Sequence, residues 1–168
     1  SVSISGTAQA HSGIGSQRQA DFYLNFPPLN KYLGLQLLGY TKLRDADRYP
    51  GGYQESDKKI FSAKLWITPD EYNKFYLLAS QERHEYSRTV GKTATVRTNR
   101  LLNSYDYKKD SYGVGYLGNF ENLNADVSYI YDQTKRKSLF DSLTPADVKN
   151  HNFNSKFSTF LDSHTLTF

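Results

Sequence analysis

The sequence predicts an α+β fold in which an antiparallel sheet packs against helices. Several stretches alternate polar and apolar residues, which is the pattern of half-buried strands. Two Thr-Pro-x-acid segments have the pattern of helix starts. With 168 residues, of which 38% are hydrophobic, the chain is long enough to bury a core of ordinary size. One domain over residues 1–168 is therefore the simplest organisation.

The first part of the chain is predicted to form a β-hairpin. Residues 2–10 and residues 20–26 both alternate, and the polar, glycine-containing stretch 13–19 between them supplies a turn. Pro27 and Pro28 end the second strand, because proline has no N–H to donate to a strand ladder.

The middle of the chain is predicted to change from strand to helix. Residues 33–43 fit either a strand or a short helix, whereas residues 45–58 have the composition of an exposed loop. Residues 60–67 alternate and predict a strand. At Thr68 a helix is expected to begin and to run to about Glu82, since Thr-Pro-Asp-Glu combines an N-cap, a proline in the first turn and a capping-box acid.

The remainder is predicted to hold two more helices and a strand. A helix from Thr93 to about Tyr105 is indicated by apolar residues at helical spacing. Glycines at 113, 115 and 118 break the pattern, and residues 126–131 fit a strand. A second Thr-Pro-x-acid segment at residues 144–147 predicts a short helix that extends through His151.

Composition limits the chemistry that the chain can perform. It has no cysteine, which excludes a thiol nucleophile, a disulfide or cysteine-bound zinc in the chain as it stands. No apolar run is long enough for a membrane-spanning helix, and no histidine has the spacing of a metal site. The net charge of +4 and the 14 tyrosines are compatible with an anionic or glycan partner. Basic residues interleaved with tyrosines at 97–109 can track a nucleic-acid backbone, but such residues more often form the solvated side of a helix.

Seven segments occur in an order that is itself informative. They are Gly6-Thr7-Ala8-Gln9-Ala10-His11-Ser12-Gly13-Ile14-Gly15, the aromatic strand 20–26 that is followed by Pro27, Pro50-Gly51-Gly52, the strand 60–67, Thr68-Pro69-Asp70-Glu71-Tyr72, Tyr86-Ser87-Arg88-Thr89 and the helix from Thr93. This order resembles papain-like cysteine hydrolases of the NlpC type, and in particular the histidine-first toxins delivered by type VI secretion, many of which cleave peptidoglycan. The resemblance covers residues 6–105.

The resemblance implies a site. The cysteine of that family falls on Ala94, so a Cys-to-Ala inactive form is expected, with His11 as the base. The start of a helix lowers the pKa of a thiol, and an imidazole across the cleft can take its proton. For the group that orients the histidine, Asp21, Tyr23 and Asn25 are candidates, because they share one face of the second hairpin strand. No cofactor and no metal are implied.

The expected function is therefore that of a secreted antibacterial effector which acts in the periplasm of a target bacterium. Its partners would be peptidoglycan or another amide substrate, a cognate immunity protein and the secretion machinery. Two alternatives remain at this point. One is a non-catalytic module that binds glycan or protein through its tyrosine-rich surface, and the other is a papain-like fold that acts on lipid or protein substrates.

Overall fold

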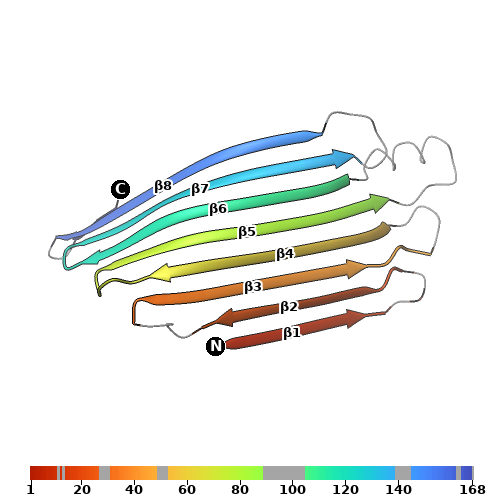
Figure 1. Ribbon diagram of the computed structural model, residues 1–168, viewed down its shortest axis with the longest axis horizontal. Coiled ribbons are helices and arrows are strands. Elements are labelled where there is room, and N and C mark those ends of the chain that lie inside the picture. Colours follow the sequence, from red (N-terminus) through yellow and green to blue (C-terminus); the bar gives the residue numbers. More distant parts are fainter. Residues whose placement is uncertain are drawn as a thin grey trace.

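The computed structural model describes residues 1–10, 12, 14–26, 31–48, 53–88, 105–138, 145–161 and 164–167. Within these ranges the chain is a nine-stranded antiparallel sheet whose strands lie in sequence order (Figure 1). The strands are β1 (Val2–Gln9), β2 (Gln17–Asn25), β3 (Leu33–Arg44), β4 (Tyr53–Ile67), β5 (Asn73–Arg88), β6 (Tyr105–Phe120), β7 (Leu123–Ser138), β8 (Ala146–Leu161) and β9 (His164–Thr167).

The predicted fold class is wrong. The described ranges contain strands and no helix, so the sheet is not packed against helices and the α+β, papain-like architecture does not form. Nor does any described segment provide a helix with the length and apolarity needed to cross a membrane. That one domain covers residues 1–168 stays a prediction.

Alternation was a reliable signal where it was recognised. The hairpin of β1 and β2 is confirmed, with Val2 opposite Leu24 and Gln9 opposite Gln17. The strands predicted at residues 60–67 and 126–131 are confirmed as parts of β4 and β7, and residues 33–43 adopt the strand alternative in β3. The expected loop at residues 45–58 is wrong in part, because β4 already begins at Tyr53.

The helix predicted from Thr68 to Glu82 is replaced by a tight turn and a long strand. Asp70 Oδ1 accepts hydrogen bonds from the backbone N–H groups of Tyr72, at 2.9 Å, and Asn73, at 2.7 Å. These are the bonds that an N-cap residue makes, but here they close the turn between β4 and β5. Capping chemistry and turn chemistry use the same side chains, so this motif did not distinguish them.

The two later helix predictions fare differently. Residues 146–151, expected at the start of a short helix, belong to β8, which pairs with β7 along residues 146–159. Residues 93–104 of the other predicted helix lie outside the described residues, and Tyr105 begins β6. The glycines at 113, 115 and 118 lie inside β6 and do not interrupt it.

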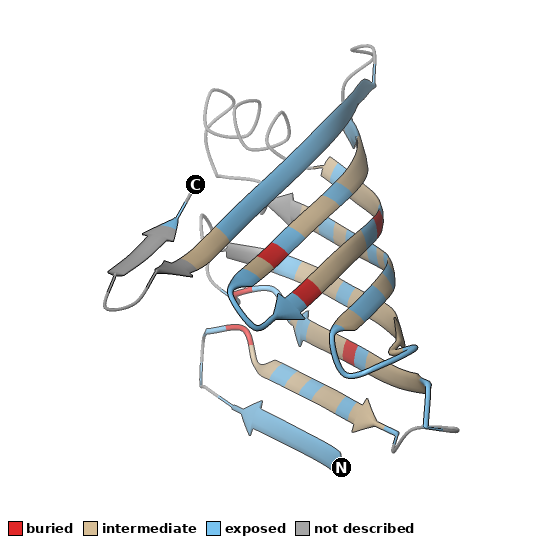
Figure 2. Cartoon of the chain, turned by 90° about the vertical axis from the view of Figure 1, so that its left-hand side faces the viewer, coloured by how far each residue is buried: buried red, intermediate tan, exposed pale blue. Residues whose placement is uncertain are grey.

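The strands form a single layer (Figure 2). Among the described residues the one apolar side chain classed as fully buried is Ala125, at 8% exposure. Two ends of the sheet can be named from the topology. The strands β1, β3, β5 and β7 finish at the loop end, on the right of Figure 1, and β2, β4, β6 and β8 finish at the turn end. The described strands therefore offer two faces and two ends, with no interior between layers.

Candidate functional site

One face of the sheet carries most of the large apolar side chains, and we call it the apolar face. Residues paired across strands share a face, and alternate residues along a strand share it too. Leu77 of β5 thus shares it with Leu65 and Val114. Leu77 is 48% exposed and Phe153 is 68% exposed. Other members are Val2, Ile4, Phe22, Leu24, Leu35, Leu37, Phe61, Ile67, Phe75, Tyr112, Tyr116, Val127, Tyr129 and Phe157.

The opposite face is polar over most of its area, and we call it the polar face. On it cations outnumber carboxylates. The cations are Lys42, Arg44, Lys58, Lys64, Lys74, Lys109, Arg136 and Lys156, and the carboxylates are Asp21, Glu82, Asp126 and Asp132. This face therefore carries an excess of positive charge, which attracts anionic ligands.

A group of aromatic and charged side chains gathers on the polar face toward the loop end. Lys58 of β4 forms an ion pair of 2.8 Å with Glu82 of β5. Next to it, Ser56 Oγ lies 3.0 Å from His84 Nε2. The pairing of β4 with β5 brings these side chains together, because Ser56 is opposite Tyr86 and Lys58 is opposite His84.

The same group continues onto β6 and β7. The His84 ring lies 6.0 Å from that of Tyr86 and 6.3 Å from that of Tyr105, and the two tyrosine rings are 5.5 Å apart. The Arg136 guanidinium lies 4.6 Å from the centre of the Tyr105 ring. We call these residues the His84 cluster: Ser56, Lys58, Glu82, His84, Tyr86, Tyr105 and Arg136.

Two titratable groups of the His84 cluster are shifted in opposite directions. Partial burial, reinforced by the positive charge of Lys58, lowers the pKa of His84 below the ordinary histidine value. The hydrogen bond to Glu82 raises the pKa of Lys58. At neutral pH the cluster therefore combines a neutral imidazole with a protonated lysine and an arginine.

A hollow of about 390 Å³ opens at this place and is lined by Tyr40, Ser56, Lys58, His84 and Tyr86, among others. Ring faces can stack on a flat ligand, and the cations can pair with its negative charge. The cluster is therefore suited to binding a flat, negatively charged ligand. Among the described residues no group of three or more metal-ligating side chains is placed to hold a metal ion.

A second aromatic group lies on the polar face toward the turn end. The Trp66 and Tyr76 rings meet edge to face at 5.2 Å. Lys64 Nζ is 4.0 Å from the Tyr76 ring centre and 4.2 Å from that of Trp66, and Lys74 lies 4.3 Å from the Trp66 ring centre. Cation–π contacts of this kind hold the rings in place.

The predicted catalytic residues are only partly visible. His11 and Ala94 lie outside the described residues, so their predicted convergence stays a prediction. Asp21 accepts a 2.6 Å hydrogen bond from Ser5 Oγ on the neighbouring strand. The backbone N–H of Asn25 donates to Ser1 at 2.8 Å, and Tyr23 is exposed. An orienting role for Asp21, Tyr23 or Asn25 likewise stays a prediction.

Comparison with known proteins shows the fold. The chain matches no protein-family model and no curated protein by sequence. Its structure resembles the siderophore receptor PirA from Acinetobacter baumannii, with a TM-score of 0.79, 16% identity and coverage of 99% of this chain and 28% of that one. The chain shares its fold with part of this receptor.

Two further solved structures agree. PirA from Pseudomonas aeruginosa gives a TM-score of 0.75 at 16% identity, covering 99% of this chain and 27% of the receptor. A mutant of the ferric enterobactin receptor PfeA from the same species gives 0.73 at 15% identity, with 99% and 29% covered. The chain thus spans less than a third of the length of these receptors.

These similarities overturn the functional expectations. The structures that share the fold are siderophore receptors and not cysteine peptidases, so the resemblance to NlpC-type hydrolases and type VI effectors is wrong. Peptidoglycan, an immunity protein and secretion machinery lose their support as partners, and so does a secreted enzyme acting in the periplasm. The two alternatives, a glycan- or protein-binding module and a papain-like fold with other substrates, are not supported either.

Sequence reasoning missed the two faces and the His84 cluster because it treated the tyrosine-rich stretches as parts of helices or as breaks. The signal was present. Alternation runs through residues 73–86 and 105–116, with apolar residues at every second position giving way to charged ones toward the loop end. When this alternation is followed along each strand, it assigns the residues to the two faces of the sheet.

Proposed function

We propose that this chain forms part of the wall of an outer-membrane-type β-barrel that takes up an iron–siderophore complex. The observation that carries the proposal is the apolar face. It is broad, exposed and covered by no second layer of described residues. In water such a face is unfavourable over this area, whereas in a bilayer it is the surface that a barrel presents to lipid.

The apolar face has the internal order of a lipid-facing wall. Aliphatic side chains such as Leu65, Leu77 and Val114 occupy its middle. Aromatic side chains lie on both sides of them along the strands. Those nearer the loop end are Phe61, Tyr112, Tyr129, Tyr131 and Phe153, and those nearer the turn end are Tyr72, Phe75, Tyr116, Phe120 and Phe157. Two aromatic girdles around an aliphatic band are typical of membrane β-barrels.

The apolar band is also slanted relative to the rows of paired residues. On β3 it extends to Leu43, which pairs with Asp57 of β4, yet β4 becomes apolar only at Phe61. On β8 it ends at Phe153, which pairs with Tyr129, while Tyr131 of β7 is still apolar. The boundary moves in the same direction at these two strand pairs, as is expected where strands tilt across the membrane, which barrel closure requires.

The edges of the sheet support a larger structure. The outer edge of β1 pairs with no other strand in the described ranges, and β8 pairs with β9 only through residues 158–161. Backbone groups cannot stay unpaired in hydrocarbon. Further strands beside β1 and β8 would satisfy them, which agrees with the fraction of each receptor that the chain covers.

The polar face supports the ligand. It would line the interior of the barrel, where its excess of cations favours an anionic ligand. The His84 cluster adds ring faces and the Arg136 guanidinium near the loop end. Siderophores are the ligands named for the receptors that share the fold, and a variant of the ferric enterobactin receptor PfeA was solved with enterobactin.

The test is uptake and binding of radioactive ferric enterobactin by cells that make the protein in its natural form, beside a hydroxamate siderophore. Arg136→Gln, on the polar face, should weaken binding roughly tenfold if the guanidinium pairs with a charged ligand group. Its neighbour Lys137→Gln removes the same charge from the other face and should leave binding unchanged. Equal effects of the two variants, or no binding of either siderophore, would reject the proposal.

A further inference from the structure

We propose that the apolar face holds one anionic phospholipid, with an acyl chain in a hollow beside Phe22 and the negatively charged phosphate headgroup on a row of cations just beyond it. This inference rests on the proposed function, since it requires that the apolar face contacts the bilayer. The lipid would be a bound component of the wall and not a transported ligand.

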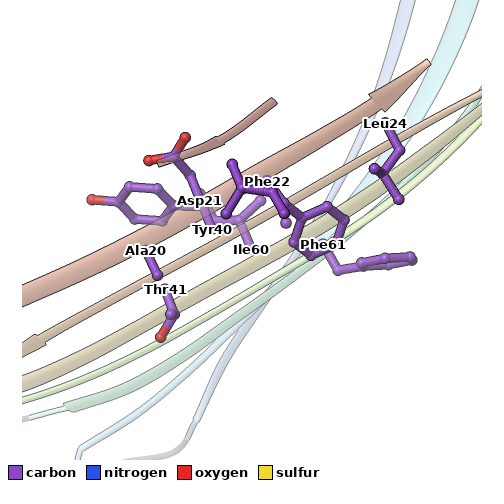
Figure 3. Close-up of a pocket in the computed structure, with 10 residues that line it drawn as sticks. Ala20, Asp21, Phe22, Leu24, Tyr40, Thr41, Ile60 and Phe61 are labelled. Carbon is purple, nitrogen blue, oxygen red and sulfur yellow. The ribbon is translucent and has the colours of Figure 1, made fainter. Parts of the chain in front are cut away.

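The hollow lies on β1 to β4 and has a volume of about 510 Å³ (Figure 3). Its apolar lining comes from Ile4, Phe22, Gly39 and Phe61, which form one continuous row of paired residues. Gly39 makes room for the Phe22 ring, because a Cβ at this position would lie 2.1 Å from a ring carbon. The neighbouring row is small, with Ala20 opposite Thr41. Small side chains between two rings leave a groove in an otherwise even surface.

The cations form the next feature toward the loop end. Lys59 is two residues from Phe61, about 7 Å along β4. It pairs with Arg83 of β5, which pairs with Lys108 of β6, which pairs with Lys135 of β7. Four cations thus stand side by side on the apolar face, beyond the last apolar side chain of each strand. We call them the cation row.

The cation row would be stabilised by an anionic group bound next to it. Like charges that lie directly opposite one another across strands destabilise a sheet. Asp57 neutralises Lys59 at 2.6 Å, and Asp110 neutralises Lys108 at 2.9 Å. Arg83 and Lys135 are exposed, and no described side chain forms an ion pair with either. Asp147 of β8 lies directly opposite Lys135. Arg83, directly beside Lys59, is therefore the cation that remains available.

The position of the cation row indicates which kind of ligand binds there. A group at the edge of the apolar band is at the level of lipid headgroups, where lysines and arginines attract anionic lipids. A free phosphate would use the cations but not the hollow, and a neutral lipid would use the hollow but not the cations. A phospholipid whose headgroup carries a net negative charge uses both.

The experiment compares spin-labelled phosphatidic acid with spin-labelled phosphatidylcholine, each carrying the label on an acyl chain. The protein in its natural form is reconstituted in phosphatidylcholine vesicles, and electron paramagnetic resonance measures the motionally restricted fraction of each lipid. We expect an association constant about fivefold higher for phosphatidic acid, the effect of one cation near a membrane surface. High salt should reduce it.

Two variants and one control test the two halves of the site. The triple variant Lys59→Gln, Arg83→Gln, Lys108→Gln should bring the ratio close to one. The control triple Lys31→Gln, Lys74→Gln, Lys156→Gln removes equal charge away from the cation row and should keep the ratio. Ala20→Phe fills the hollow and should lower the phosphatidic acid constant roughly threefold through lost apolar burial.

The outcomes separate this inference from the proposed function. Restricted lipid with no preference for phosphatidic acid would overturn the lipid site and leave the membrane wall intact. An absence of any restricted lipid would overturn both. If Ala20→Phe binds phosphatidic acid as the wild type does, the hollow takes no part and the site as proposed is wrong.

Discussion

The two faces belong to the same hydrogen-bonded layer, but their side chains make different contacts. On the polar face, side chains contact one another through specific groups, as in the 2.6 Å hydrogen bond that Ser111 Oγ donates to Asp132. In the aliphatic band of the apolar face, Leu77 and Val114 remain about half exposed. Side chains of the polar face thus find partners within the described chain, whereas those of the apolar band have no second layer of described residues over them.

This difference shows where the stability of such a sheet must come from. The described strands bury almost no apolar side chain in a protein core. In the proposed barrel, their apolar stabilisation comes from transfer into hydrocarbon. The polar face, in contrast, can be wet and still keep its ion pairs and hydrogen bonds. Mutations of one type should therefore change the free energy of unfolding by different amounts on the two faces.

The largest expected difference concerns an arginine placed on either face. Leu77→Arg puts a cation in the middle of the apolar band and should lower the free energy of unfolding by about 2–4 kcal/mol in a bilayer. Ile130→Arg, on the polar face near Asp132, should change it by less than about 1 kcal/mol. Reversible urea unfolding in lipid vesicles measures both.

If the apolar face were exposed to water, the expected difference between the two variants would disappear. In water, an arginine at the half-exposed Leu77 position costs little, because the guanidinium stays hydrated. Equal and small effects of Leu77→Arg and Ile130→Arg would therefore show that the apolar face is not in contact with lipid.

The sequence predicted strands correctly where alternation was the only pattern present. The prediction failed where alternation overlapped with helical spacing. Residues 60–67 alternate without competing motifs, and β4 forms there. In residues 72–79 the apolar side chains satisfy both spacings: Phe75, Leu77 and Ala79 alternate, whereas Tyr72, Tyr76 and Ala79 are spaced as on a helix. The capping motif at Thr68 then favoured the wrong spacing.

The site was harder to predict than the strands. The His84 cluster draws residues from β4, β5, β6 and β7, and His84 and Arg136 are 52 positions apart in the sequence, far beyond any local pattern. Only the register places Tyr105 between Tyr86 and the Arg136 side chain. Register depends on which strands are neighbours, and a single sequence with a mistaken helix does not supply that order.

A smaller difference between the faces is expected at two glycines covered by aromatic rings. A Cβ at Gly115 would lie 2.2 Å from the Tyr76 ring on the polar face, and a Cβ at Gly39 would lie 2.1 Å from the Phe22 ring on the apolar face. Tyr76 is held by Trp66 and Lys64, whereas Phe22 can swing into the hollow. Gly115→Ala should therefore cost about 1–3 kcal/mol by overpacking, and Gly39→Ala less.

The measurement is again urea unfolding in vesicles, with both alanine variants compared under one condition. If Gly39→Ala costs more than Gly115→Ala, the Phe22 ring is fixed more firmly than the Tyr76 ring, and the hollow beside it is not adaptable. The double variant Gly115→Ala, Tyr76→Leu serves as a control, because removing the ring should remove most of the penalty.

The smallest effect is electrostatic and concerns His84, which lies beyond the apolar band toward the loop end. Burial and Lys58 lower its pKa in the folded chain, so the unfolded chain takes up the proton first as the pH falls through about 6.5. The His84 cluster should therefore lose stability below that pH and be unaffected above it.

Nuclear magnetic resonance of labelled histidine in micelles should show His84 titrating below the ordinary range. Lys58→Gln should move its midpoint upward because a nearby positive charge is removed, whereas Lys74→Gln, at the other end of β5, should leave it in place. If Lys58→Gln leaves the titration midpoint of His84 unchanged, the 2.8 Å ion pair with Glu82 cancels the effect of the lysine charge on the imidazole. Burial alone would then lower the pKa of His84.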